Sequence, residues 1–197
     1  MAGLKSFLPV MAEAFGTTAD ALYSRQRALT QMGLLPYVAG KGPGSGVPLT
    51  ADSLGVMIIA LMASDNLRDT DTRVKKLCEA PPDKLIGDES KHYMALPTFR
   101  SAMETAIKEF GQQHSGFVVK SIRVSPDKGQ FLLIELSKSS SSGFQTERNL
   151  KTKTFRVKRT KSVTTKVSSI VRTSELDLLT LPFARLMNEF AIAEKQV

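Results

Sequence analysis

The chain has few of the residues that build redox and metal sites. Of its 197 residues one is cysteine, Cys78, and two are histidines, His92 and His114. One cysteine cannot form an internal disulfide, so we expect a cytoplasmic protein in which Cys78 is a small buried apolar residue. Because there is no histidine pair or cysteine cluster, the sequence predicts no metal site, no cofactor and no enzymatic activity.

Long apolar runs and catalytic signatures are also missing. The longest apolar run, residues 56–63, is far shorter than the roughly 20 residues of a membrane-spanning helix, and the first residues are too polar for a signal peptide. The glycine-rich stretch 40–46, GKGPGSG, lacks the Gly-Lys-Ser/Thr ending of a nucleotide-binding loop. We therefore expect neither membrane contact nor an NTPase.

The composition is that of a folded, basic protein. Hydrophobic residues make up 42%, charged residues 23%, and the formal net charge is +8. Residues 1–80 carry 8 basic and 7 acidic side chains, whereas residues 116–172 carry 13 basic and 3 acidic ones. A positive field of this kind draws a protein toward polyanions, above all nucleic acid.

Periodicity and turn residues predict an α+β protein with two domains. In residues 1–80 we expect helices over 6–15, 17–32, 50–63 and 70–79, with a glycine-rich hairpin at 33–49. Residues 81–97 are interpreted as a linker. In residues 98–197 we expect a small antiparallel sheet with two covering helices, from strands at 117–125, 130–137, 152–158 and 163–171, a mobile loop at 138–149, and helices at 98–112 and 180–194.

The segment 8–27 has the spacing of a helix-turn-helix. Such a motif needs a small residue in the first helix, a glycine at the turn and an apolar residue in the second helix, and Ala12, Gly16 and Leu22 stand at those places. Arg25 occupies a position where a further apolar residue is expected. The glycine-rich hairpin and the apolar helix that follow complete the order of a winged helix-turn-helix.

This interpretation assigns DNA contacts to the second helix and to the tip of the hairpin. Arginine and glutamine can bind base edges, and hydroxyl groups can bind phosphates. The expected contact residues are Thr17, Thr18, Tyr23, Ser24, Gln26, Arg27, Lys41 and Ser45. The alternative is a plain helical hairpin with a polar outer face.

A second basic element lies at residues 151–161, KTKTFRVKRTK. Its cations are Lys151, Lys153, Arg156, Lys158, Arg159 and Lys161. They could bind phosphates or an acidic protein, or they could simply protect an exposed sheet edge from aggregation.

The stretches at residues 8–63 together resemble the N-terminal DNA-binding region of phage-type and gene-transfer-agent-type bacterial transcription regulators. The resemblance implies a regulator of bacterial or prophage genes that binds specific double-stranded DNA; we also expect a homodimer that could contact the transcription machinery. Two alternatives stay open. One is a phage-encoded module that binds a host factor through the basic hairpin, and the other is an RNA-binding protein.

Overall fold

The computed structural model describes residues 3–40, 45–63, 70–82, 96–110, 117–125, 128–136, 147–156, 174–177 and 181–195. In chain order the helices and strands are α1 (Leu4–Phe15), α2 (Ala19–Gln31), α3 (Ala51–Ala63), α4 (Thr70–Cys78), α6 (Phe99–Lys108), β1 (Phe117–Ser125), β2 (Lys128–Leu136), β3 (Glu147–Arg156), β4 (Ser174–Asp177) and α7 (Leu181–Lys195). The fold is α+β, as expected.

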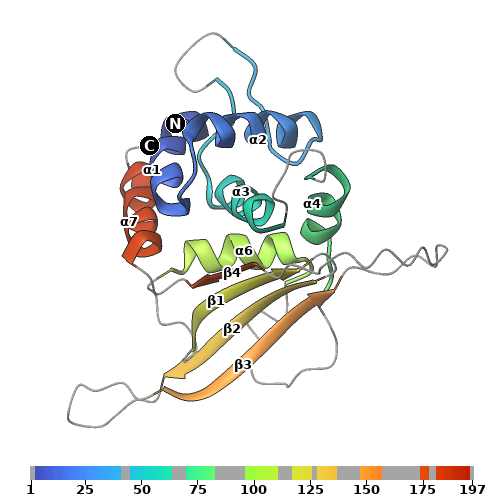
Figure 1. Ribbon diagram of the computed structural model, residues 1–197, viewed down its shortest axis with the longest axis vertical. Helices are drawn as coiled ribbons and strands as arrows, with labels where there is room; N and C mark the ends of the chain where they lie inside the picture. The colour runs from blue at the N-terminus through green and yellow to red at the C-terminus, as the bar shows by residue number, and fades with distance from the viewer. Residues whose placement is uncertain are drawn as a thin grey trace, which may run out of the picture.

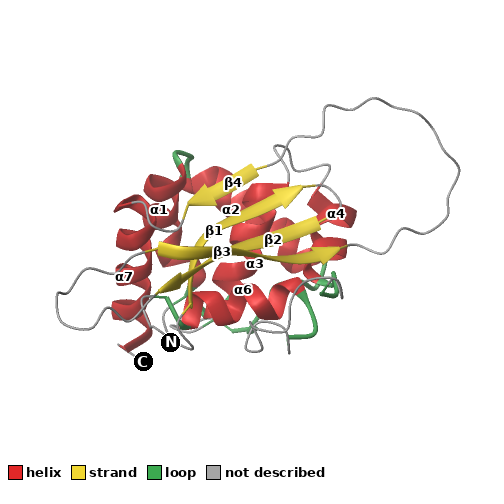
Figure 2. Ribbon diagram, turned by 90° about the horizontal axis from the view of Figure 1, so that it is seen from below, coloured by secondary structure: helices red, strands yellow, loops and turns green. Residues whose placement is uncertain are grey.

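The helices pack on one face of a four-stranded antiparallel sheet whose strand order is β3-β2-β1-β4 (Figure 1). Helix α6 lies against the sheet, α3 lies above α6, and α2 is outermost. Seen from below, the strands lie in front of α2 and α3 (Figure 2). The sheet therefore forms one outer layer of the described molecule, and α2 lies in the outer layer on the opposite side.

Helix α3 is the centre of the core. Its residues are apolar on every side, and all of them except Asp52 and Leu61 are buried. Such a pattern is typical of a helix that is surrounded by protein. Its main neighbour is α6, and Gly55 allows the close approach, because a Cβ atom added there would lie 3.4 Å from both Met103 Cβ and Ile107 Cδ1.

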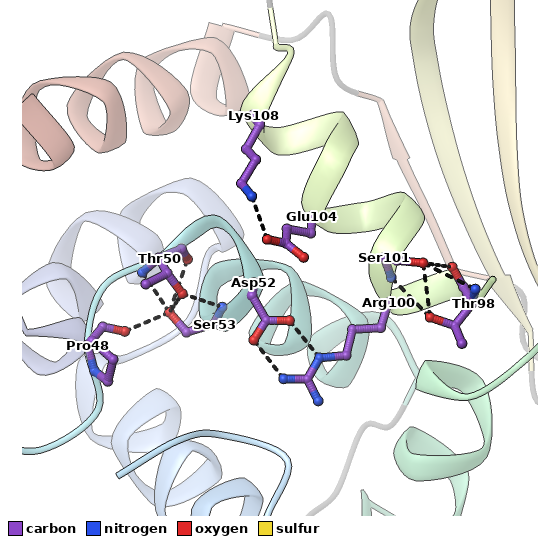
Figure 3. A network of polar contacts seen from close by, with 9 residues as sticks. All are labelled: Pro48, Thr50, Asp52, Ser53, Thr98, Arg100, Ser101, Glu104 and Lys108. Atoms are coloured by element: carbon purple, nitrogen blue, oxygen red, sulfur yellow. Dashed lines mark hydrogen bonds and ion pairs between the residues drawn. The ribbon is translucent and has the colours of Figure 1, made fainter. Parts of the chain in front are cut away.

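Helices α3 and α6 begin with the same four-residue capping pattern, Thr-x-x-Ser (Figure 3). The Thr50 N–H donates to Ser53 Oγ (2.9 Å), and the Ser53 N–H donates to Thr50 Oγ1 (3.1 Å). The corresponding distances for Thr98 and Ser101 are 3.1 and 3.2 Å. Each pair satisfies two backbone donors at a helix start, so the sequence itself defines where both helices begin.

An ion pair joins these two helix starts. Arg100 Nε and Nη2 donate to Asp52 Oδ1 and Oδ2, each at 2.6 Å (Figure 3). The hydrogen bond with Asp52 raises the pKa of Arg100 still further, so the guanidinium remains charged. The two-pronged geometry sets the angle at which α6 starts across α3.

The sheet contacts the helices through Ile122, Val124 and Gly129, which are all buried. Gly129 pairs with Val124 and lies directly under the ring of Phe99, the first residue of α6. A Cβ atom at position 129 would lie only 2.4 Å from Phe99 Cζ. A glycine here therefore lets an aromatic ring rest on the backbone of β2.

Residues from both predicted domains share one core, where we expected a separate core for each. The buried apolar residues from Leu4 to Phe190 form a single cluster. The two ends of the predicted linker lie together as well, because the Phe99 N–H donates to the Ala80 carbonyl (2.9 Å). Residues 83–95 lie outside the described part of the chain, so the outcome for the linker concerns only its ends.

Three further expectations need correction. The helix predicted at 180–194 was expected to cover the sheet, but α7 packs chiefly on α1. Helix α3, from the first predicted domain, contacts β1 and β4 in addition to α6. Strand β3 begins at Glu147, inside the segment predicted as a mobile loop. Strand β4 was not predicted; it pairs with β1, while the predicted strand at 163–171 lies outside the described residues.

Candidate nucleic-acid interface

Helices α1 and α2 are joined by the sharp turn expected at Gly16. This residue adopts the left-handed conformation (φ 62°, ψ 37°), which glycine reaches without steric cost. The Thr17 N–H donates to the Ala12 carbonyl (3.0 Å), so the last turn of α1 is closed before the chain reverses. Thr18, rather than Thr17, caps α2, because its Oγ1 accepts from the Ala21 N–H (3.2 Å).

The two residues that the helix-turn-helix spacing places between the helices lie on the inner side of the turn. Ala12 and Leu22 are both buried. Arg25, in the place where an apolar side chain is expected, is also buried, and its Nη1 donates to the Ala60 carbonyl (2.5 Å) in the last turn of α3. Carbonyls at a helix C-terminus attract cations, so this hydrogen bond helps an arginine to occupy an inner position.

The outer side of α2 carries polar residues along one face of the helix; we call this face the outer stripe, or α2 stripe. Its residues recur at spacings of three and four and are all exposed: Asp20, Tyr23, Ser24, Arg27 and Gln31. Helix α2 runs along the top of the molecule in Figure 1, away from the sheet. This outer stripe presents a carboxylate at its start, followed by a phenol, a hydroxyl, a guanidinium and an amide on one helix face.

Gln26 does not belong to the outer stripe, and its predicted role as a groove contact is wrong for this conformation. The residue is only 6% exposed, and its Oε1 has no hydrogen-bond partner among the described residues. The phase of the helix explains this. Leu22 and Leu29 define its inner face, and positions 25 and 26 lie between them on that same face.

Lys5 belongs to the same surface, although sequence reasoning missed it. Its Nζ lies 4.9 Å from the centre of the Tyr23 ring, over the face of the aromatic system. Such a contact holds a cation beside the outer stripe of α2. The available signal was weak, because Lys5 is an isolated basic residue eighteen positions away in the chain.

The glycine-rich hairpin begins beside this surface. Val38 and Gly46 exchange two backbone hydrogen bonds of 2.8 Å, and Gly46 has a φ of 100° that favours glycine. Its base is held against the start of α1, because the Leu4 N–H donates to the Val47 carbonyl (2.8 Å). Tyr37 and Val38 are exposed apolar side chains at this base.

The predicted contacts at the tip of the hairpin are only partly placed. Ser45 is half-buried just before Gly46. Lys41 lies outside the described residues. The α1 start, the α2 stripe and the hairpin base therefore adjoin one another, while the proposed tip contact stays a prediction.

The basic run falls on β3 and beyond it. Lys151, Lys153 and Arg156 lie in β3, which pairs with β2 and is the last strand on its side of the described sheet. Thr154 between them is buried. Lys158, Arg159 and Lys161 lie outside the described residues. The described part of the run lies on β3, in the sheet, whereas α2 lies on the other side of the helices (Figure 1).

Other chemistries find little support in the described part of the chain. No group of three or more His, Cys, Asp or Glu side chains there is arranged to hold a metal ion. Burial raises the pKa of the Cys78 thiol to about 12, so this cysteine stays protonated and unreactive at neutral pH. Among the described helices, none has both the length and the apolar character needed to cross a membrane.

Comparisons of the chain with protein-family models, with curated proteins and with solved structures give no match.

Proposed function

We propose that the protein is a winged helix-turn-helix regulator of bacterial or prophage genes that binds specific sequences in double-stranded DNA. The observation that carries the proposal is the outer stripe of α2, which follows a tight left-handed glycine turn and faces away from the core. A helix with a free polar face fits the major groove of B-DNA, which is about 12 Å wide. The net charge of +8 favours a polyanionic partner for the protein as a whole, although residues 1–80, which include α2, contribute only one unit of it.

Each part of this surface would have its own task. Arg27 would read a base, because a guanidinium can bind guanine through two hydrogen bonds. Ser24 and Lys5 would contact phosphates on either side of the groove, and these contacts fix orientation rather than sequence. The hairpin at 33–49 would lie along the backbone beside the groove. In this arrangement specificity depends on α2, while affinity depends on its surroundings.

The proposal is tested by selecting bound sites from a random duplex library and then measuring binding to the selected site by fluorescence anisotropy. We expect a defined site and a steep loss of affinity as salt rises. Arg27→Ala should weaken binding to that site by about 1–3 kcal/mol, with a smaller effect on unrelated duplex. Lys76→Ala is the matched control, because Lys76 is an exposed cation on α4 and is not part of the polar stripe on α2.

Two results would contradict the proposal. One is a lack of duplex binding at low salt, and the other is an equal loss of affinity in the Arg27→Ala and Lys76→Ala proteins. A preference for single-stranded RNA that survives Arg27→Ala would instead favour the RNA-binding alternative.

A protein-binding role for β3 is the second candidate. It is favoured by the place of this strand at the end of the described sheet, where its basic run adjoins an unpaired strand edge. An edge strand can add a strand from a partner. Charge reversal at Lys151 and Lys153 together should abolish binding of an acidic host protein while leaving duplex binding intact.

A further inference from the structure

The outer face of α7, which packs on α1 at one side of the molecule (Figure 1), carries a second stripe that shares no residue with the stripe on α2. Pro182, Arg185, Glu189 and Ile192 are exposed and follow one another at spacings of three, four and three residues. This is the spacing with which one helix contacts another along a seam. Ile192, which is 53% exposed, is the large aliphatic side chain of this stripe.

A hollow of about 490 Å³ lies beside this stripe, between α1 and α7. Its apolar lining residues are Val10, Ala14, Pro182 and Leu186, and its charged ones are Glu13, Arg185 and Glu189. An apolar hollow next to an exposed isoleucine suggests that the two could be complementary surfaces of one contact.

The charges at the hollow are arranged for an additional partner. Arg185 Nη1 lies 2.7 Å from Glu13 Oε1, and both side chains are 67% exposed. Glu189, one helical turn after Arg185, is exposed and forms no ion pair with another described residue. A partner that brings a cation to position 189 would pair with this carboxylate.

We propose that the occupant is a second copy of this chain, docked with its α7 antiparallel to the first. Antiparallel helices related by a twofold axis pair residues whose numbers have a constant sum. When Arg185 faces Glu189 of the second copy, Ile192 faces Pro182 of that copy, at the lip of its hollow. One register thus satisfies the charges and covers both exposed isoleucines.

Other arrangements of the same helices are less favourable. In a parallel pair, Arg185 would face Arg185 and Glu189 would face Glu189, so both contacts would be repulsive. The antiparallel register gives two ion pairs and two apolar contacts. Since each copy contributes little more than one helix, the interface is small, and we expect a dimer that depends on protein concentration.

The test uses sedimentation velocity of the full chain, without DNA, over a range of concentrations. The wild type should dimerise, and Ile192→Ser should weaken the dimer. Arg185→Glu and Glu189→Arg should each weaken it roughly tenfold or more, because like charges then face each other twice. Mixing these two single variants should restore association, since every 185–189 contact then pairs opposite charges.

Lys76→Glu is the matched control, because it changes the net charge as Arg185→Glu does but lies on α4. It should dimerise like the wild type. Circular dichroism at a concentration where the chains are monomeric should show that all variants are folded, with only a small change for Arg185→Glu, which also loses the exposed ion pair with Glu13.

A wild type that stays monomeric at all concentrations would overturn the proposal. So would a dimer that the single variants do not weaken, or weakened variants that fail to associate when mixed. These outcomes are independent of DNA binding, because the α7 stripe shares no residue with the α2 stripe.

Discussion

The contact between Gly129 and Phe99 illustrates how one residue sets the distance between two layers. Phe99 has no exposed surface, and its ring lies on the backbone of β2 where a side chain would otherwise stand. Close-packed interiors leave no free volume into which such a ring could move. The helix–sheet distance at this point therefore depends on the absence of a single methyl group.

Gly129→Ala should destabilise the protein by about 1–3 kcal/mol, because the new Cβ atom would overlap the Phe99 ring. Urea denaturation measures this change in the free energy of unfolding. Replacing Phe99 by leucine in the same chain should reduce the cost of the alanine, since the overlapping ring atoms are removed. If the costs of the two substitutions simply add, the ring is not what excludes a side chain at position 129.

At the residue scale, the spacing of Leu22 and Leu29 already indicates which residues of α2 face the core, although two of those residues are polar. Leu22 and Leu29 are seven residues apart, and the positions three and four after Leu22 must share their face. Those positions hold Arg25, which stands where an apolar residue is expected, and Gln26, whose polar character suggested a groove contact. Helical phase decided their burial, and the Ala60 carbonyl made the burial of Arg25 tolerable.

At the scale of elements, the pair Asp52–Arg100 connects the two halves of the chain. It joins the first turn of α3 to the first turn of α6, and the two side chains are 25% and 31% exposed. The shared Thr-x-x-Ser caps place Asp52 and Arg100 at the same position of their helices. Each cap is a local pattern, but only the packing of α6 on α3 brings the two side chains together.

A double-mutant cycle with Asp52→Asn and Arg100→Met should give a coupling energy of about 1 kcal/mol or less. Partial exposure screens the pair, while its two-pronged geometry keeps it near the upper end of surface values. The coupling should fall when urea denaturation is repeated in 1 M salt. The pair Glu104–Lys108, which lies within α6 at 2.6 Å, is the control and should couple more weakly. Equal coupling energies for the two pairs would argue against a special role for Arg100.

At the scale of the whole molecule, the helices of the first 80 residues and the last helix stabilise each other. The rings of Phe7 in α1 and Phe190 in α7 meet edge to face, with 6.2 Å between their centres. Phe183 makes a similar contact with Phe110, which follows α6, at 5.5 Å. The C-terminal helix therefore connects the N-terminal helix to the region of the sheet.

Phe190→Ala should lower the free energy of unfolding by about 3–5 kcal/mol, because it leaves a cavity in the shared core. Hydrogen exchange of α3 amides should accelerate by the same free energy, although α3 is distant in sequence, and thermal unfolding should show one transition. Lys75→Ala, at an exposed position, is the control. Two transitions, or unchanged exchange in α3, would mean that the halves unfold independently.

Sequence alone determined the elements whose signals are local. Thr50 and Thr98 mark helix starts, Gly16 marks a turn, and the alternation in residues 117–125 marks a strand, because caps, left-handed turns and side-chain alternation depend on near neighbours in the chain. Only the tertiary structure decided that both halves share one core, that Arg25 donates to the Ala60 carbonyl, and that Lys5 lies over Tyr23. Those outcomes depend on contacts between residues far apart in the chain, and no local pattern encodes which distant surface a helix will meet.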